Sequence, residues 1–259
     1  MEPGLAPETL CFECNICGER CQVAIDQLRR EVASCCACGS TPRTRAIIRA
    51  LSLELFGQNL VLPDFPASRG ISGLGMTDWE GYASRLAEKF GYTNTYYHKE
   101  PQLDISNPEI PDSLVQSNDF IISSEIFEHV VPPVLRAFEN TFKMLKPGGV
   151  LVLTVPYGTQ AETIEHFPDL YDFTITADSG SYRLENVTRF GEVQEFHDLI
   201  FHGGPGSTLE MRVFAEAALL RHFTEAGFEA ITVHRTPDFS HGIWWPEPWA
   251  FPISARRPR

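Results

Sequence analysis

The chain has 259 residues, of which 43% are hydrophobic and 21% charged, a composition typical of a folded globular protein and not of a disordered or fibrous one. Its length suits one large domain with a small accessory domain. The 34 acidic residues outnumber the 21 basic ones, and the resulting net charge of −13 disfavours nucleic acid and anionic membranes as partners. No apolar run approaches the roughly 20 residues that span a bilayer, and the N-terminal sequence lacks a signal-peptide pattern, so we expect a cytoplasmic protein with no membrane segment.

The seven cysteines are crowded into the first 38 residues. Four of them form two pairs, Cys14-x2-Cys17 and Cys35-x2-Cys38, each followed by a glycine. Two residues between two cysteines allow both sulfurs of a tight turn to face one ion, and two such turns complete a tetrahedron. We therefore expect these four cysteines to hold a structural zinc ion, although Cys11-x2-Cys14 leaves the register of the first pair open.

A helix is predicted directly after the cysteine segment. Thr41 and Pro42 suit its N-cap and first position, apolar residues recur on one face, and Gly57 ends it. Five arginines near the cysteines make this the most basic stretch of the chain, and we expect them to form a solvated face rather than a phosphate site. They are Arg29, Arg30, Arg43, Arg45 and Arg49.

The rest of the chain alternates between strand and helix patterns. Strands are predicted at 70–76, 93–98, 103–105, 119–124, 150–155 and 230–234, and helices at 79–90, 135–145 and 214–226. The aromatic tail 244–251 is the candidate for a last, antiparallel strand. Alternation of this kind, with nearly continuous apolar strands, favours a parallel sheet with helices on both faces.

These patterns divide the chain into three parts. We expect a zinc ribbon at 1–40, a linker helix and connection at 41–68, and a large domain at 69–259. The segment 157–212 interrupts the alternating pattern with aromatic, histidine and charged residues, and is expected to be an insertion after the fifth strand.

Two linked motifs in the large domain identify a family. Asp119-Phe-Ile-Ile-Ser-Ser-Glu-Ile-Phe-Glu128-His129 is followed by Leu145-Lys-Pro-Gly-Gly149 and an apolar strand. This pattern resembles the middle of a class I S-adenosylmethionine-dependent methyltransferase, over about 104–156. The resemblance implies a Rossmann-like class I methyltransferase sheet with helices on both faces, and S-adenosylmethionine as cofactor at the carboxyl ends of its strands.

The resemblance also implies which residues hold that cofactor. Gly73 and Gly75 would form the loop after the first strand, or else a simple tight turn. Glu100 would hold the ribose hydroxyls, with Asp78 as the less favoured alternative, and Asp104 would lie beside the adenine or cap a helix. The expected cofactor-binding set is Gly73, Gly75, Asp78, Glu100, Asp104, Ile105, Ser124 and Glu125.

Methyl transfer to a hydroxyl requires alignment of the nucleophile and a group that accepts its proton. The insertion offers His197, His202 and Asp198 as catalytic candidates, since histidine titrates near neutral pH, although packing is the more common role of any one histidine. The glycines that follow His202 would let the backbone present it to a cleft. Trp244 or Trp245 could stack on a sugar or aromatic substrate, or belong to the core.

Three functions are compatible with these features. The first is O-methylation of a small-molecule or glycan hydroxyl. The second is methylation of RNA gripped by the ribbon, which the acidic charge disfavours. The third is a non-catalytic zinc-binding adaptor that has kept the methyltransferase fold without its cofactor.

Overall fold

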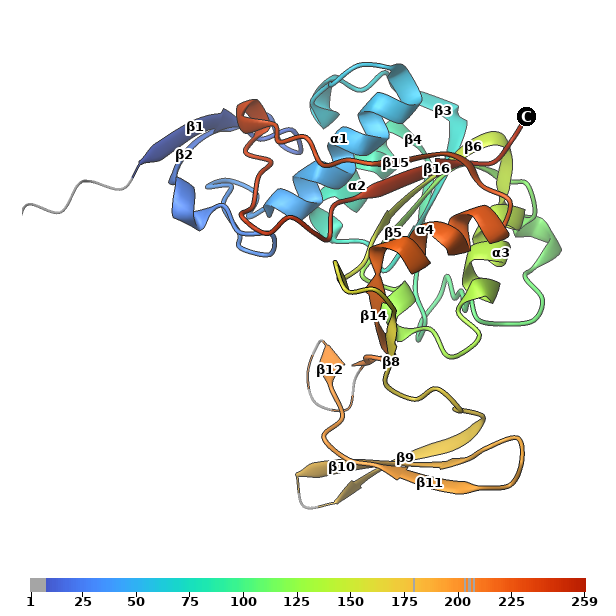
Figure 1. The fold of residues 1–259 in the computed structure, drawn as a ribbon. Helices are drawn as coiled ribbons and strands as arrows, with labels where there is room; N and C mark the ends of the chain where they lie inside the picture. The colour runs from blue at the N-terminus through green and yellow to red at the C-terminus, as the bar shows by residue number, and fades with distance from the viewer. Residues whose placement is uncertain (1–7, 179, 203, 205, 207) are drawn as a thin grey trace, which may run out of the picture.

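The structure, a computed structural model, describes residues 8–259 except 179, 203, 205 and 207 (Figure 1). It begins with an antiparallel hairpin of β1 (Thr9–Glu13) and β2 (Arg20–Ala24), which is followed by the short 3-10 helix η1 (Ile25–Gln27). Among the described residues, no helix is both long enough and apolar enough to cross a membrane.

Helix α1 (Pro42–Phe56) has the boundaries that its sequence predicts. The Thr41 side chain accepts a hydrogen bond from the backbone N–H of Thr44, and Pro42 occupies the first turn, where no N–H is needed. Gly57 ends the helix in the left-handed conformation at φ 65°, which glycine adopts without strain. The apolar face of α1 packs against the central sheet at β6 and β16.

The central sheet has six strands in the order β15-β16-β6-β5-β3-β4. Four of them are mutually parallel: β3 (Ser68–Met76), β4 (Phe90–Thr95), β5 (Asn118–Ser124) and β6 (Leu145–Thr154). Strand β16 (Ile253–Arg256) pairs antiparallel with both β6 and β15 (Glu229–Val233). The predicted Rossmann-like fold is confirmed, but the antiparallel strand follows the aromatic tail instead of being formed by it.

Side chains alternate between the two faces of the sheet, and each face has its own core. Phe120 and Ile122 of β5 join one apolar cluster, whereas Ile121 between them joins the other. The first cluster is covered by α1 and α2 (Glu80–Lys89), and the second by α3 (Leu135–Met144) and α4 (Glu216–Glu225). Phe12 and Ile16 of the cysteine segment are buried in the first cluster, so the ribbon and the sheet share a core.

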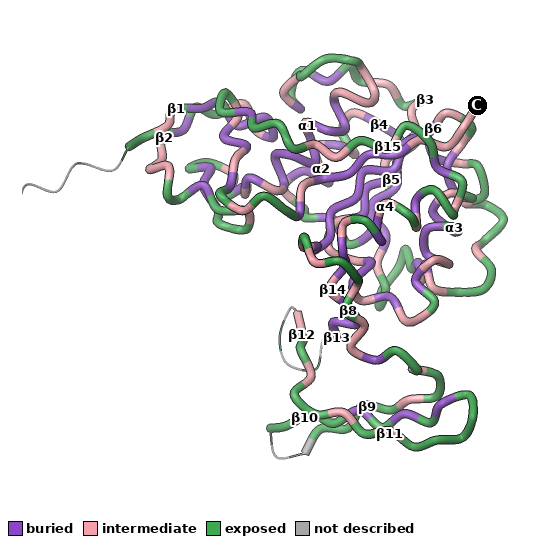
Figure 2. The backbone as a smooth tube through the Cα atoms, viewed as in Figure 1, coloured by how far each residue is buried: buried purple, intermediate pink, exposed green. Residues whose placement is uncertain are grey.

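The predicted insertion forms small sheets beyond the carboxyl edge of the central sheet. Strands β9 (Asp172–Asp178), β10 (Ser181–Val187) and β11 (Val193–Phe196) make a meander that projects from the molecule (Figure 1). Much of this sheet is exposed (Figure 2). The remaining strands are β7 (Tyr157–Gly158), β8 (Ile164–Glu165), β12 (Phe201–His202), β13 (Thr208–Leu209) and β14 (Arg212–Ala215).

Arg212 anchors the insertion to the main domain. Its side chain is fully buried, and its guanidinium donates hydrogen bonds to the carbonyl oxygens of Phe127 at 3.0 Å and Val130 at 2.6 Å. It also pairs with Glu165 at 2.8 Å. These contacts hold the start of β14 against η4 (Phe127–His129), the turn that follows β5. Three further 3-10 turns lie outside the insertion, namely η2 (Leu62–Asp64), η3 (Asp112–Leu114) and η5 (Phe239–His241).

Candidate functional site

Polar side chains gather where the parallel strands end. Asp78 follows β3, Asn94 and Thr95 end β4, and Ser124 and Glu125 end β5. Ligands of open α/β sheets bind at this carboxyl edge, beside the point where the strand order reverses, which here lies between β3 and β5. The fold therefore brings three of the eight expected cofactor residues, Asp78, Ser124 and Glu125, to one edge.

Asp78 lies in a closed polar pocket at this edge. Its carboxylate accepts a hydrogen bond from the hydroxyl of Tyr92, and its backbone N–H donates to Asn94 Oδ1 at 2.9 Å. Burial raises the pKa of Asp78 to about 7, although the hydrogen bond from Tyr92 acts in the opposite direction.

Gly73 and Gly75 do not form the expected loop, because both lie inside β3. A Cβ on Gly73 would overlap the Phe120 ring, and one on Gly75 would overlap the Tyr92 hydroxyl and the Asp78 carboxylate. The rings of Tyr92 and Phe120 stack, with centroids 6.0 Å apart. The missing side chains therefore make room for aromatic neighbours on the adjacent strands, a packing role that sequence reasoning did not predict.

The two carboxylates expected at the nucleoside, Glu100 and Asp104, line one cleft of about 700 Å³ beyond the end of β4. Asp104 Oδ1 accepts hydrogen bonds from the backbone N–H and the hydroxyl of Ser106, at 2.8 and 2.6 Å. Glu100 Oε2 accepts one from the backbone N–H of Gln102 at 3.1 Å. The strand predicted at 103–105 is absent, because this segment turns and buries Leu103 and Ile105 beneath the cleft.

Ser124 and Glu125 are held by arginines from the ribbon side of the molecule. Arg30 binds Glu125 with two hydrogen bonds, at 3.0 and 2.8 Å. Arg43, in the first turn of α1, donates to the Ser124 hydroxyl and lies 4.0 Å from Glu125. Burial alone would raise the pKa of Glu125, but the charge and hydrogen bonds of Arg30 outweigh it and keep that pKa below its ordinary value.

The predicted solvated face of arginines is therefore wrong for all of them except Arg29. Arg45 is fully buried; it donates to the carbonyl oxygens of Ser40 and Gly242, each at 2.7 Å, and its guanidinium lies over the Phe12 ring. Arg49 pairs with Asp238 at 3.3 Å. The arginine side chains of this segment bind carboxylate, carbonyl or aromatic groups of the protein itself, and this accounts for the basic character of the segment.

The structure brings together the four cysteines that were expected to bind zinc. The sulfur atoms of Cys14, Cys17, Cys35 and Cys38 all lie within 4.8 Å of one another. A hydrogen bond with Cys38, followed by burial, raises the pKa of Cys14 to about 12. Four sulfur donors at this spacing fit a tetrahedral Zn²⁺ site, in which the ion would stabilise the thiolates.

Of the catalytic candidates, only His202 lies against the main domain, beside His129 of η4. Its Nε2 lies 3.1 Å from Glu210 Oε2, and its ring meets that of His129 with centroids 4.9 Å apart. His197 and Asp198 follow β11 in the projecting sheet, where both are exposed, and His197 pairs with Glu195 at 3.1 Å. The expected catalytic group of the three residues is therefore not assembled.

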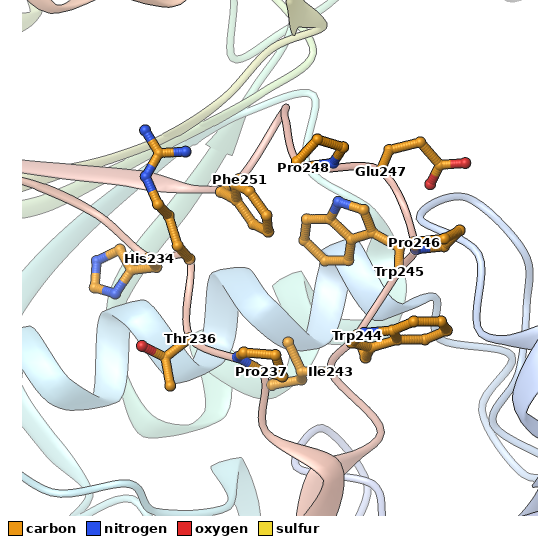
Figure 3. Close-up of a pocket in the computed structure, with 11 residues that line it drawn as sticks. His234, Thr236, Pro237, Ile243, Trp244, Trp245, Pro246, Glu247, Pro248 and Phe251 are labelled. Carbon is orange, nitrogen blue, oxygen red and sulfur yellow. The ribbon is translucent and has the colours of Figure 1, made fainter. Parts of the chain in front are cut away.

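The aromatic tail forms the wall of a separate small cavity of about 160 Å³ (Figure 3). Trp245 is buried and stacks on Phe251 with centroids 5.2 Å apart, and its indole N–H donates to the carbonyl oxygen of Trp249 at 3.2 Å. The backbone N–H of Phe251 donates to the Tyr157 hydroxyl at 3.1 Å. Trp244 and Trp245 both line the cavity, and Trp245 is the buried one of the two.

No family model matches the sequence, and no curated protein matches it. Solved methyltransferase structures are similar to the chain at low identity. An amino pentose methyltransferase from Micromonospora echinaspora with bound S-adenosylmethionine is 15% identical, over 85% of this chain and 92% of that one, with a TM-score of 0.43. An S-adenosylmethionine-dependent methyltransferase from Mesorhizobium loti is 16% identical, over 82% and 98%, with a TM-score of 0.40. The Burkholderia thailandensis 1,6-didemethyltoxoflavin-N1-methyltransferase is 12% identical, over 84% and 79%, with a TM-score of 0.42.

Proposed function

We propose that the chain is an S-adenosylmethionine-dependent methyltransferase that acts on a hydroxyl of a small molecule or glycan unit. The observation that carries this proposal is the cleft beyond β4, which contains both carboxylates that the family resemblance implies for the nucleoside. Its volume of about 700 Å³ lies within the roughly 300–1,000 Å³ of typical ligand sites. The residues present thus fit the nucleoside half of the cofactor.

In this proposal Glu100 accepts hydrogen bonds from the ribose hydroxyls and Asp104 accepts one from the adenine amino group. The amino-acid end of the cofactor carries an ammonium and a carboxylate, and the neighbouring opposite charges of Glu125 and Arg43 suit these two groups. Ser124 lies between them as a further hydroxyl partner. When bound, the cofactor supplies a methyl group whose carbon bonds to the acceptor oxygen while the sulfonium sulfur takes the electron pair of the breaking C–S bond.

His202 is the residue that we assign to the acceptor hydroxyl. Its side chain is 40% exposed, so an acceptor can reach it, and the buried Glu210 fixes its ring. Glu210 also lies 2.9 Å from His166 Nε2, which leaves both of its oxygens engaged. A histidine oriented by a carboxylate is suited to activating a hydroxyl near neutral pH. We further infer that the cysteine cluster holds a structural zinc ion, because four thiolates leave no open position for catalysis.

The packing around the glycines supports a second candidate function. Gly73 and Gly75 lie inside β3 and pack against Phe120 and Tyr92, so they do not form the glycine loop that the family resemblance implies. A chain that had lost the cofactor would retain the fold as a zinc-binding adaptor. RNA methylation has less support, since two of the arginines that could bind phosphate, Arg30 and Arg45, are bound to Glu125 and to the Ser40 carbonyl oxygen.

Calorimetric titration of the zinc-loaded full chain with S-adenosylmethionine and S-adenosylhomocysteine tests the proposal. We expect both to bind, and Asp104→Ala to weaken binding roughly 10- to 100-fold, since a hydrogen bond to a charged group contributes about 1.5–3 kcal/mol. Glu109→Ala is the matched control, because Glu109 is an exposed carboxylate in the same connection that does not line the cleft.

Binding that is weakened equally by both variants would contradict the assignment of the cleft. The absence of any binding to the wild-type chain would exclude the methyltransferase proposal and favour the adaptor.

A further inference from the structure

Three side chains with metal-ligating atoms meet between the sheet edge and the insertion. Single donor atoms of Glu128, His129 and His202 all lie within 4.8 Å of one another. Glu128 and His129 belong to η4, the turn after β5, whereas His202 ends β12 in the insertion. The cluster is thus assembled by the fold from segments more than 70 residues apart in the sequence.

The carboxylate of Glu128 is buried without a partner. The residue has no exposed surface, and within the described part of the chain neither of its carboxylate oxygens has a hydrogen-bond donor. The ring of His129 lies beside it, with Nε2 3.6 Å from Glu128 Oε1, too far for a hydrogen bond. A buried carboxylate without a donor is costly, and a cation between these two atoms would satisfy it.

The orientation of His129 suits metal binding. Its Nδ1 lies 2.9 Å from the carbonyl oxygen of Leu209. Because a carbonyl only accepts hydrogen bonds, Nδ1 carries the proton, and in the neutral ring Nε2 presents its lone pair toward Glu128. Histidine ligands of metals usually donate their second ring nitrogen to a carbonyl or carboxylate in this way.

The ring of the third residue, His202, contacts a second carboxylate, that of Glu210. Glu210 is buried, with one oxygen 3.1 Å from His202 Nε2 and the other 2.9 Å from His166 Nε2. The backbone of the neighbouring Met211 donates to the Glu128 carbonyl oxygen at 2.8 Å, which ties this segment of the insertion to the turn that bears the other two side chains. A carboxylate of this kind fixes the ring of a ligating histidine and strengthens it as a ligand.

We propose that Glu128, His129 and His202 form a second metal site, separate from the cysteine cluster, for a divalent transition metal ion such as Zn²⁺. Two imidazoles and one carboxylate suit such an ion better than Mg²⁺ or Ca²⁺, which prefer oxygen ligands alone. Three protein ligands leave a coordination position open, as catalytic zinc sites require. That position opens toward solvent on the side of His202, the most exposed of the three side chains.

The role of the ion rests on the proposed function. An ion in this place would bind the oxygen of the acceptor and make its hydroxyl easier to deprotonate, with the proton passing to solvent water. His202 would then act as a ligand of the ion and not as the proton acceptor. The charge of Glu125 acts on both Glu128 and His129, so the site adjoins the end of β5 where we place the amino-acid part of the cofactor.

Metal content of the full chain tests the site. After zinc loading and desalting, elemental analysis of the wild-type protein should give two ions per chain. Glu128→Gln and His202→Ala should each retain one. His197→Ala should keep both ions, because His197 is an exposed histidine of the same insertion that pairs with a glutamate but has no third ligand near it among the described residues. Circular dichroism of each variant reports whether it is folded; His202 is partly exposed, so its variant decides the question if Glu128→Gln does not fold.

Cobalt substitution identifies which ion is lost. The absorption that disappears in His202→Ala should lack the sulfur-to-cobalt charge-transfer bands of the cysteine cluster. One ion in the wild-type chain, or two ions in a folded His202→Ala, would overturn the site. The proposed function fails separately, because a chain with two ions that does not bind S-adenosylmethionine would refute the methyltransferase assignment and leave the metal site standing.

Discussion

The substitution Asp78→Asn should change how the stability of the protein depends on pH. Asp78 is buried, and its pKa is raised to about 7 from 3.8 because burial disfavours the charged carboxylate. The hydroxyl of Tyr92 donates to one carboxylate oxygen, and an asparagine could accept the same hydrogen bond through Oδ1. The substitution therefore removes the titration while keeping the size and the main contact of the side chain.

The sign follows from linkage between protonation and folding. A folded-state pKa above the unfolded value means that the folded chain binds the proton more tightly, so stability decreases as pH rises from about 4 to about 7 and is constant above that. Each pH unit in this range lowers the free energy of unfolding by about 1.4 kcal/mol. Between pH 5.5 and 8.5 the wild-type chain should therefore lose about 2 kcal/mol relative to Asp78→Asn.

Urea unfolding of the zinc-loaded chain at pH 5.5, 7.0 and 8.5, without cofactor, measures this difference. The series stays above the isoelectric point of about 5.0, and other groups titrate equally in both proteins, so their contributions cancel. Asp112→Asn, at an exposed carboxylate, is the control and should follow the wild type. If the free energies of wild type and Asp78→Asn change in parallel with pH, the buried pocket does not perturb this carboxylate as described.

Three more predictions concern the packing around the site. Arg30→Met removes the closer ion pair of Glu125 and should lower the free energy of unfolding by about 2–4 kcal/mol at pH 7. The loss should be smaller at pH 5, because burial raises the pKa of Glu125 once Arg30 no longer opposes it, so that the variant can protonate this carboxylate; urea unfolding at both pH values checks this. Gly73→Ala should lower the free energy of unfolding by about 1–3 kcal/mol, because the added Cβ overlaps the Phe120 ring. Adding Phe120→Leu to this variant should restore part of the lost stability, whereas Phe120→Leu alone should destabilise the protein. Zinc chelation should lower the melting temperature in calorimetry and expose the buried face of the ribbon to proteolysis, and equal melting curves with and without chelator would contradict a structural ion.

The sequence predicts those parts of the fold in which a local pattern has one physical cause. The apolar runs at Phe120–Ile122 and Val150–Val155 could only be buried strands, and the cysteine spacing could only bring four sulfurs together. The boundaries of α1 were predictable as well, since its cap and its terminal glycine are local signals. Glu100 and Asp104 were implied by the family resemblance, and the fold places them in one cleft.

Partners that are distant in the sequence could not be predicted in this way. Arg30 and Arg43 appear as surface charges to any local pattern, because nothing near them in the sequence indicates that Glu125, about 80 to 95 residues later, is their partner. The glycines of β3 were misread for a similar reason: the rings that occupy their space come from β4 and β5. A signal did exist for Glu128 and His129, which belong to the motif, but not for their meeting with His202.

The ribbon and the carboxyl edge of the sheet form a single structural unit. Arg30 lies between the two cysteine pairs and Arg43 lies in the first turn after them, and both reach the residues that end β5. Loss of zinc would therefore release Glu125 and Ser124 even though no cysteine touches them. If zinc binding strengthens cofactor binding by some factor, the cofactor must strengthen zinc binding by the same factor. Saturating S-adenosylmethionine should accordingly raise the chelator concentration needed to remove the ribbon zinc, and Arg30→Met should abolish this effect while leaving the cysteine cluster intact.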